Sequence, residues 1–313
     1  MKNRRLGKTG LMISEVGFGG RSLGGKKENE MNTVFCNLRE KDAKNLITNA
    51  IKLGINLFET SDSYSSGQSE IRIGEALLDV RENVHIFTKA GTEFLNKEKT
   101  LSRTNLSFNY LTNSLDESLT RLQTDYVDVF QTHGIPNVQD VDQIIKTFDK
   151  MKSENKARFC GISIGNAISK GLELIEYDFI DCIQLSFSLI NRDALKELIP
   201  KCHKKNIGVI VNRPLGEGFL GNFTIKQNFS KDDFRSKYSL EKLSKIKKQL
   251  ESLSFLKYLD MPLSQIALSY ILQNDQISTC IPSSNSIQQL IQNVKSTEIT
   301  LDSKLIDKIN SLI

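Results

Sequence analysis

Residues 55–70, INLFETSDSYSSGQSE, decide the fold, because a short apolar run ends there in a cluster of polar side chains. Glu59 and Tyr64 follow that run closely. Lys89 ends the next apolar run, VHIFTK, and His133 ends the one after it, DYVDVFQTH. Parallel α/β barrels carry their active sites at the carboxyl ends of successive strands. The stretch therefore predicts such a barrel, with Tyr64 near a lysine and a histidine as a candidate proton donor.

The rest of the chain repeats the same alternation of apolar runs and helix-like segments. Eight strand-like runs cover residues 16–19, 55–60, 84–89, 126–133, 157–163, 180–186, 207–213 and 277–282. Helix-like segments between them include residues 43–53, 112–122, 138–154, 193–204 and 263–273. Eight strands alternating with helices indicate parallel βαβ units. We expect an α/β fold, a single (β/α)8 TIM barrel that forms one domain over residues 1–313.

Composition narrows the class of protein further. The 313 residues are 39% hydrophobic and 25% charged, with a net charge of +5, which is typical of a globular protein. The charge is too balanced to require nucleic acid or an anionic membrane, and the longest apolar runs have the length of strands. Five scattered cysteines without a CxxC pair indicate reduced thiols. We expect a cytoplasmic protein without a signal peptide or a metal site.

Three further segments carry structural expectations. RRLGKTGLMISEV, residues 4–16, predicts a β-hairpin that turns at residues 8–10 and closes the barrel bottom. Residues 219–238 form a connection too long for an ordinary loop, which suggests a lid. Residues 240–253 predict a helix with one apolar face and its lysines mostly in solvent. The apolar residues of that face are Leu240, Leu243, Ile246, Leu250 and Leu253.

Taken together, the motifs resemble those of the aldo-keto reductases along nearly the whole chain. GFGGRSLGG is not GxGxxG and does not open a βαβ unit, which disfavours a Rossmann domain. The resemblance implies a (β/α)8 barrel that binds a nicotinamide dinucleotide in extended form. The matching pieces are RRLGKTGLMISEVGFGG, GINLFETSDSYSSGQSE, the lysine of FTKAG, SLTRLQTDYVDVFQTHG, the GIS of FCGISIG, the glutamine of IQLSF, GVIVNRPLGEGFLG, PLSQIALSYIL and IPSSNSIQQLIQN.

The chemistry of carbonyl reduction assigns roles to four residues. A tyrosine hydroxyl, with a reference pKa of about 10, keeps its proton at neutral pH, and a nearby ammonium eases its donation. Tyr64 and Lys89 fit these roles, and His133 can donate a hydrogen bond to the same oxygen. The family places an aspartate where this chain has Glu59, which keeps the charge on a longer side chain. We interpret Glu59 as preserving the ion pair with Lys89.

The resemblance also implies a cofactor site. Ser163 and Gln184 would hydrogen-bond the nicotinamide amide, although Ile164 stands where the family often has asparagine, unless Asn166 replaces it. Other expected cofactor-binding residues are Gly20, Arg21, Glu59, Arg213, Pro214, Leu215, Gly218, Leu220, Ser283, Gln289 and Asn293.

Cofactor choice depends on the segment after Ile281–Pro282. Many NADPH-using relatives carry a lysine and an arginine there, and these cations grip the 2′-phosphate. Here the aligned residues are Ser283, Ser284 and Gln289. We therefore expect NADP as cofactor with weakened selectivity, and dual use or NAD preference as the alternative.

Two functions remain open from the sequence. The first is NAD(P)H-dependent reduction of a small aldehyde or ketone, with a sugar or its derivative as one candidate substrate. Its substrate pocket would be lined near Arg21, residues 26–37, Tyr64 and residues 219–234. The second is a cofactor-binding regulatory subunit with little turnover, which only the Glu59 replacement favours. His85 and His203 lack a catalytic context and are interpreted as structural or exposed. The oligomeric state has no signal in the sequence.

Overall fold

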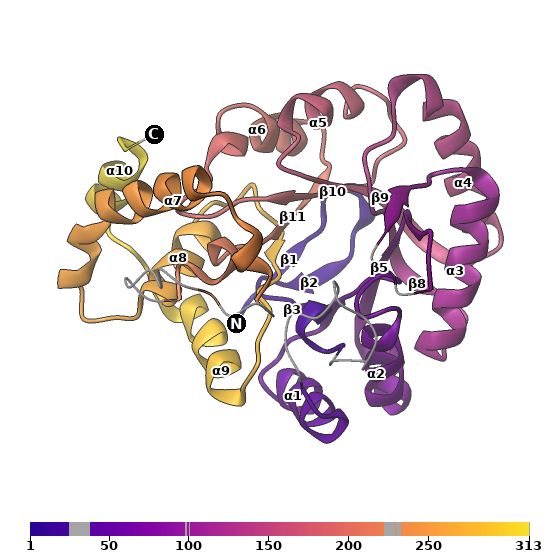
Figure 1. The fold of residues 1–313 in the computed structure, drawn as a ribbon, viewed down its shortest axis with the longest axis horizontal. Coiled ribbons are helices and arrows are strands. Elements are labelled where there is room, and N and C mark those ends of the chain that lie inside the picture. The colour runs from indigo at the N-terminus through magenta and orange to yellow at the C-terminus, as the bar shows by residue number, and fades with distance from the viewer. Residues whose placement is uncertain (25–37, 98, 100, 222–228, 230–232, 313) are drawn as a thin grey trace.

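Eight parallel strands form one barrel in the computed structural model, which describes residues 1–24, 38–97, 99, 101–221, 229 and 233–312 (Figure 1). The strands are β3 (Phe18–Gly19), β4 (Leu57–Glu59), β5 (His85–Ala90), β8 (Val127–Thr132), β9 (Ala157–Gly165), β10 (Cys182–Ser186), β11 (Gly208–Asn212) and β12 (Thr279–Cys280). They are hydrogen-bonded in the order β12-β11-β10-β9-β8-β5-β4-β3. Each predicted run overlaps one of these strands, so the predicted barrel is confirmed.

The two edge strands of this sheet meet and close the barrel. The N–H of Cys280 donates to the carbonyl of Glu15 at 3.0 Å, and the N–H of Gly17 donates to the carbonyl of Cys280 at 2.9 Å. A parallel bridge also joins Val16 to Cys280. Closure leaves the sheet without a free edge and directs alternate side chains inward.

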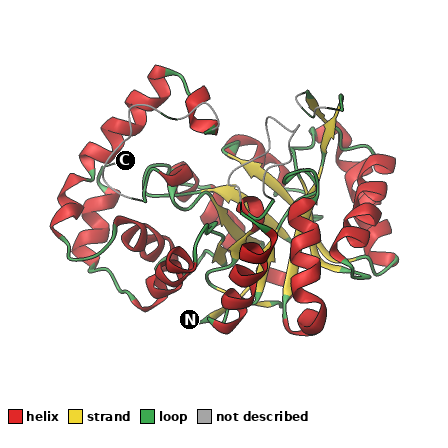
Figure 2. Cartoon of the chain, turned by 60° about the horizontal axis from the view of Figure 1, so that its bottom comes forward, coloured by secondary structure: helices red, strands yellow, loops and turns green. Residues whose placement is uncertain are grey.

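Helices cover the outside of the barrel, and the strands gather at its centre (Figure 2). Within the described residues, no helix is long and apolar enough to cross a membrane. The helices are α1 (Glu40–Lys52), α2 (Gln68–Leu77), α3 (Phe108–Leu122), α4 (Val141–Ser153), α5 (Ile168–Leu174), α6 (Leu198–Lys204), α7 (Leu240–Ser252), α8 (Leu263–Leu272), α9 (Ile287–Lys295) and α10 (Ser303–Asn310).

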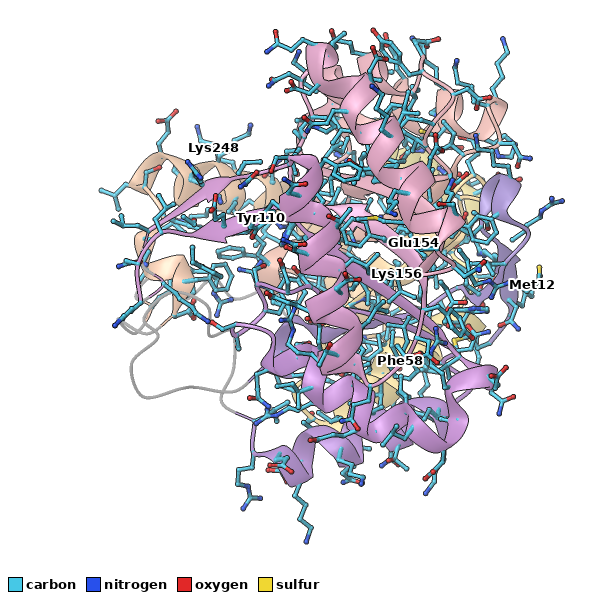
Figure 3. All side chains as sticks on the ribbon, turned by 90° about the vertical axis from the view of Figure 1, so that its right-hand side faces the viewer. Met12, Phe58, Tyr110, Glu154, Lys156 and Lys248 are labelled. Carbon is cyan, nitrogen blue, oxygen red and sulfur yellow. The ribbon has the colours of Figure 1, made fainter. Side chains whose placement is uncertain are left out.

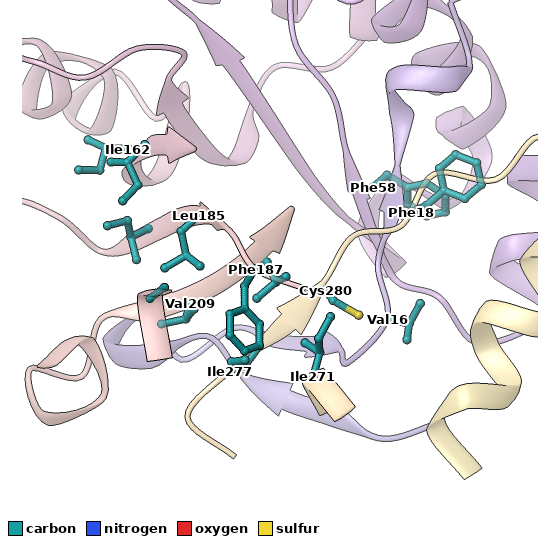
Figure 4. Packing of buried hydrophobic residues seen from close by; sticks show 14 of the residues in the cluster. Val16, Phe18, Phe58, Ile162, Leu185, Phe187, Val209, Ile271, Ile277 and Cys280 are labelled. Atoms are coloured by element: carbon teal, nitrogen blue, oxygen red, sulfur yellow. The ribbon is translucent and has the colours of Figure 1, made fainter. Parts of the chain in front are cut away.

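Two apolar clusters hold the barrel together. The larger one lies between strands and helices, where Val16, Phe58 and Cys280 pack among residues from distant parts of the chain (Figure 4). Figure 3 shows the contrast between Phe58 in the interior, fully buried, and Met12 at the edge, 49% exposed. The smaller cluster fills the barrel itself and includes Leu57 and Phe87. Burial of this apolar surface is the main stabilising contribution to the fold.

The N-terminal hairpin seals one end of the barrel, as predicted. Strands β1 (Asn3–Arg5) and β2 (Met12–Ser14) pair antiparallel, and the chain turns through Gly7–Thr9 and Gly10, whose φ is +75°. Leu6, Leu11 and Ile13 belong to the inner cluster. The hairpin therefore closes the bottom, which leaves the opposite end of the barrel as the open face.

Several features differ from the sequence-based expectations. The antiparallel pair β6 (Thr92–Phe94) and β7 (Ser102–Thr104) was not predicted, because its short strands are largely polar. The predicted apolar face of α7 is buried only in part, because Leu240 is 86% exposed whereas Ile246 and Leu250 are buried. This first residue of the helix lies beyond the core.

Some expectations fall on residues that are not described. The insert at residues 26–37 and Cys36 lie outside the described residues, as does much of the 219–238 connection. Its described end forms a short 3₁₀ turn at Phe234–Lys237. The cysteines 160, 182, 202 and 280 are free thiols and buried.

Candidate active site

A cavity of about 980 Å³ opens at the carboxyl ends of the strands. Glu59 is the last residue of β4, Tyr64 lies in the loop that follows, and His133 comes directly after β8. All three line the cavity, and Lys89 lies buried beside them on β5. The structure therefore brings together the four side chains that the sequence singled out. We call these four residues the catalytic end of the cavity.

One carboxylate oxygen organises the catalytic end. Oε1 of Glu59 is ion-paired with the ammonium of Lys89, which also donates to the carbonyl of Thr60 at 2.6 Å. The same oxygen lies 3.4 Å from the Tyr64 hydroxyl and accepts from Nε2 of Gln184 at 3.1 Å. Glu59 and Lys89 are 3% and 1% exposed. Such a buried pair is rigid, because breaking it would leave a charge without a partner in a dry environment.

Burial and the charges of their neighbours together determine the pKa values of Tyr64 and Lys89. Burial raises the pKa of Tyr64 above its ordinary value of 10.0, and the charge of Glu59 adds to the rise. Lys89 lowers that pKa, as expected from its charge, but burial outweighs it. Burial opposes the charge on Lys89, yet Glu59 and Tyr64 prevail and raise its pKa. Tyr64 thus keeps its proton, and Lys89 keeps its charge, at neutral pH.

His133 is held from behind by two hydroxyl groups. Its Nδ1 lies 2.9 Å from Oγ of Ser61 and 3.2 Å from Oγ of Ser63. Its ring meets the ring of Tyr64 edge-on, with centroids 6.0 Å apart. Burial and the positive charge of Lys89 lower the pKa of His133 to about 3, so the imidazole is uncharged at neutral pH. A neutral imidazole carries one proton, on the nitrogen that its partners select.

Polar side chains continue around the barrel rim from the catalytic end. Oγ of Ser163 donates to Oε1 of Gln184 at 2.9 Å, and Nδ2 of Asn212 lies 3.4 Å from the same oxygen. Asn212 is a residue that the sequence analysis missed, although its position at the end of β11 is the relevant signal. Asn166 does not line this cavity, and its Oδ1 accepts from Nδ2 of Asn191 at 2.9 Å. Ile164 lines the cavity instead.

The loop after β11 forms the next wall. Arg213, Pro214, Leu215 and Gly218 line the cavity, and an ion pair of 3.3 Å joins Nη1 of Arg213 to Oε1 of Glu217. Both partners of that pair have left-handed backbone, with φ of 51° and 58°. Non-glycine residues hold such a conformation at an energetic cost, which is typical of binding loops.

Two predicted cofactor residues lie away from the cavity. Leu220 is fully buried in the apolar core. Gly20 is buried too, and a Cβ there would approach the Glu59 carbonyl to 2.6 Å. A glycine is therefore required at position 20 by its packing against β4. The neighbouring Gly19 and Arg21 line the cavity.

The far part of the cavity is lined by uncharged polar residues. Ser283, Gln289 and Asn293 lie there, and Nδ2 of Asn293 donates to Oγ of the buried Ser284 at 3.0 Å. Oε1 of Gln289 accepts from the N–H of Asn285 at 2.7 Å. We call Ser283, Ser284, Gln289 and Asn293 the neutral end. Among the described residues that line this cavity, the lysine and arginine side chains are Arg21 and Arg213, neither of which belongs to the neutral end.

This arrangement suits proton transfer coupled to the binding of a long polar molecule. Tyr64 offers a proton, Lys89 and Glu59 fix its surroundings, and the remaining walls offer amides, hydroxyls and backbone groups. No group of three or more His, Cys, Asp or Glu side chains in the described part of the chain is arranged to hold a metal ion. The groups that line this site are suited to acid–base chemistry on a bound organic molecule.

Comparisons with known proteins agree with this geometry. A family model described as "Aldo/keto reductase family" matches residues 15–313. An uncharacterized oxidoreductase, YqkF, from Bacillus subtilis is 30% identical over 95% of this chain and 91% of its own length. The NADH-specific methylglyoxal reductase of Escherichia coli is 28% identical over 96% and 95%. The holo form of aldo-keto reductase AKR11C1 from Bacillus halodurans has a TM-score of 0.81 at 29% identity, over 100% and 96%.

Proposed function

Because this chain belongs to the aldo/keto reductase family, we propose that it reduces a small aldehyde or ketone to an alcohol with Tyr64 as the proton donor. The protein is an NAD(P)-dependent oxidoreductase of carbonyl compounds. In this proposal residues 1–313 act as one cytoplasmic barrel domain. A small sugar or sugar derivative is one candidate substrate.

The observation that carries the proposal is the contact of Tyr64 with a buried ion pair. The ammonium of Lys89 lies 4.8 Å from the centre of the Tyr64 ring, and Glu59 touches both groups. As Tyr64 gives up its proton, the ammonium stabilises the phenolate that forms. His133 orients the carbonyl oxygen by a hydrogen bond. Glu59 forms the ion pair with Lys89 although its side chain is longer than that of aspartate. This argues against a loss of activity caused by the glutamate.

The residues present fit a nicotinamide dinucleotide. When bound, it supplies the hydride. Ser163 and Gln184 would hold its amide, since both offer hydrogen-bonding groups at the rim next to Glu59. Arg213, in the loop after β11, would hold the pyrophosphate, because a guanidinium suits an anion. The neutral end would hold the adenosine.

The neutral end also bears on cofactor choice. A 2′-phosphate carries about two negative charges and needs charged donors to offset its desolvation. Ser283 and Gln289 supply neutral hydrogen bonds, so we infer that NADPH and NADH are both accepted. The NADH specificity in the name of the Escherichia coli relative supports an NADH-using enzyme on this scaffold. The protein would then bind NADPH less than about a hundredfold tighter than NADH, by about 1.4 kcal/mol per decade.

A carbonyl panel tests the proposal. The purified protein is mixed with NADH or NADPH and small aldehydes, ketones and aldoses, and cofactor oxidation is followed at neutral pH. Turnover of at least one carbonyl is expected, with saturation in both substrates. A protein that binds the cofactor yet oxidises it with no carbonyl would instead be the regulatory subunit of the alternative hypothesis. Because the chain has no tryptophan, cofactor binding is measured from the fluorescence of the reduced nicotinamide or by calorimetry.

A further inference from the structure

A chain of hydrogen-bonding groups leads from His133 through the buried Ser61 to Asp62, which is half-buried. Oγ of Ser61 lies 2.9 Å from Nδ1 of His133 and 3.0 Å from Oδ1 of Asp62. Ser61 is fully buried, and neither Ser61 nor Asp62 lines the large cavity. The proposed reduction uses His133 from its cavity side and leaves this interior connection without a role.

We propose that Ser61 and Asp62 are positioning residues that determine which ring nitrogen of His133 carries the proton. The inference rests on the proposed function, because it concerns the histidine that would face the carbonyl. Nδ1 meets the serine hydroxyls, so Nε2 is the nitrogen left to act in the cavity. An imidazole donates from Nε2 only when the proton is on Nε2.

When Asp62 is protonated, the hydrogen bonds run towards the cavity. The carboxylic acid donates to Oγ of Ser61, and the serine hydroxyl donates to Nδ1 of His133. The imidazole proton is then on Nε2, where it can bond to a carbonyl oxygen. This state favours the reduction of a carbonyl.

When Asp62 is ionised, the direction reverses. The Ser61 hydroxyl donates to the carboxylate, so Oγ of Ser61 accepts from Nδ1–H of His133. Nε2 then presents a lone pair, which accepts a hydrogen bond from an alcohol and repels a carbonyl oxygen. This state favours the oxidation of an alcohol.

The surroundings of Asp62 place this change near neutral pH. Burial, together with the charge of Glu70 on α2, raises the pKa of Asp62 to about 7, against the hydrogen bond from Ser61. The other ionisable groups that act on Asp62 come from α3. They are Arg121, whose Nε is 2.6 Å from Oε2 of Glu70, and the hydroxyl of Tyr110 (Figure 3).

The neighbouring ionisations lie outside this range. His133 has a pKa lowered to about 3, and the pKa of Tyr64 is raised above 10.0. A change of His133 between pH 6 and 8 therefore reports Asp62. Two groups compete with this relay. Oγ of Ser63 lies 3.2 Å from Nδ1 of His133 and 3.0 Å from Oγ of Ser61, and the backbone carbonyl of Lys89 accepts from Oγ of Ser61 at 3.1 Å. Donation from Ser63 at every pH would hold the proton on Nε2 and abolish the switch.

Nitrogen NMR of ¹⁵N-histidine-labelled protein reads the tautomer without turnover. The chain has three histidines, and the His133→Gln variant assigns the signals of His133. In the wild type we expect the proton to move from Nε2 to Nδ1 with a midpoint near pH 7. In Asp62→Asn the side chain does not ionise, so we expect a single tautomer of His133 that does not change from pH 5 to 9. Ser63→Ala is the matched control and is expected to keep the switch.

Kinetics provide the second readout. Above pH 7, kcat/KM for carbonyl reduction by the wild type should fall by about tenfold per pH unit, as expected for one titrating group. Asp62→Asn should flatten this limb. The amide replaces a carboxyl whose raised pKa makes ionisation costly in the folded state, so the variant should be at least as stable above pH 7. Ser61→Ala removes the bridge without removing a charge and should flatten the limb as well.

The outcomes separate the two proposals. An unchanged tautomer in the wild type from pH 5 to 9, or a wild-type response in both Asp62→Asn and Ser61→Ala, overturns the role of Ser61 and Asp62. A tautomer switch in a protein that reduces no carbonyl of the panel supports the relay and removes the proposed function. If Asp62→Asn does not fold, Ser61→Ala decides the question alone.

Discussion

At the catalytic end of the cavity a buried ion pair lies beside a neutral phenol and a neutral imidazole, whereas at the neutral end the polar atoms belong to hydroxyls and amides. Glu59 and Lys89 neutralise each other in the interior. Ser284, Gln289 and Asn293 satisfy one another and the nearby backbone by uncharged hydrogen bonds. The charged pair thus lies beside the proposed proton donor, and the neutral end offers uncharged hydrogen bonds. Each prediction below tests one side of this contrast.

The largest effect is expected from Tyr64→Phe, which removes the proposed proton donor and keeps the ring. General acid catalysis contributes about 10²–10⁴-fold, so kcat for carbonyl reduction should fall by that range. Cofactor affinity, measured by calorimetry, should stay within experimental error. Tyr258→Phe is the control, because that hydroxyl belongs to a side chain that is 91% exposed. An undiminished kcat in Tyr64→Phe would rule out this residue as the acid.

Lys89→Met should lower kcat by about a hundredfold, near the lower limit for loss of general acid catalysis. The pKa of Tyr64 rises further when the cation is removed, and Glu59 is left buried without its partner. Breaking such a pair lowers the free energy of unfolding by about 3–5 kcal/mol. Denaturant unfolding is the measurement.

The double variant Lys89→Met/Glu59→Gln sharpens this test. It should recover stability relative to Lys89→Met without recovering turnover, because no buried charge remains while the acid still lacks its cation. Equal stability of the single and double variants would show that Glu59 finds another partner.

Glu59→Gln and Glu59→Asp separate the charge of this residue from its length. The glutamine loses a charge-assisted bond worth about 1.5–3 kcal/mol, so kcat should fall about tenfold or more. The aspartate keeps the charge but is shorter by one bond of about 1.5 Å, which should weaken the contact with Gln184 and change kcat only a few-fold. Steady-state kinetics of both variants measure the two losses. A larger loss of kcat in Glu59→Asp than in Glu59→Gln would show that the length of this side chain matters more than its charge.

The smallest effect concerns the neutral end. Ser283→Lys with Gln289→Arg supplies two cations, each able to form a charge-assisted bond to a 2′-phosphate. We expect NADPH to bind about tenfold tighter or more, while the affinity for NADH stays nearly unchanged. Titration of both cofactors measures this. Equal tightening of the two would mean that the new cations contact the pyrophosphate instead.

How far the sequence predicts this molecule depends on whether the signal is local. The strands and the meeting of Glu59, Tyr64, Lys89 and His133 are predictable, because short apolar runs ending in polar groups mark the carboxyl edge of a barrel. Asn212 was missed although it ends such a run, whereas the Ser61–Asp62–His133 contacts form between side chains that only the folded chain brings together. The β6–β7 pair was missed because its strands are short and polar. Helical periodicity places Leu240 on the apolar face of α7 but does not show where the core ends.

The sequence also did not predict that the pKa of Tyr64 is raised. Its neighbour Lys89 was expected to lower that pKa, and it does act in that direction. The larger contribution comes from burial, which depends on the packing of the loop after β4. Spacing along a chain therefore predicts which charges meet, but the dry surroundings that determine the net pKa follow from the fold.

The most direct test of the contrast is kcat/KM for NADH and for NADPH, measured with the wild-type protein at a saturating concentration of one carbonyl. A competent catalytic end beside a neutral end predicts turnover with both cofactors and a ratio below about a hundredfold, equivalent to less than about 2.8 kcal/mol of discrimination. Turnover with neither cofactor would contradict the proposed role of the catalytic end. A thousandfold or greater preference for NADPH would show that other residues hold the 2′-phosphate.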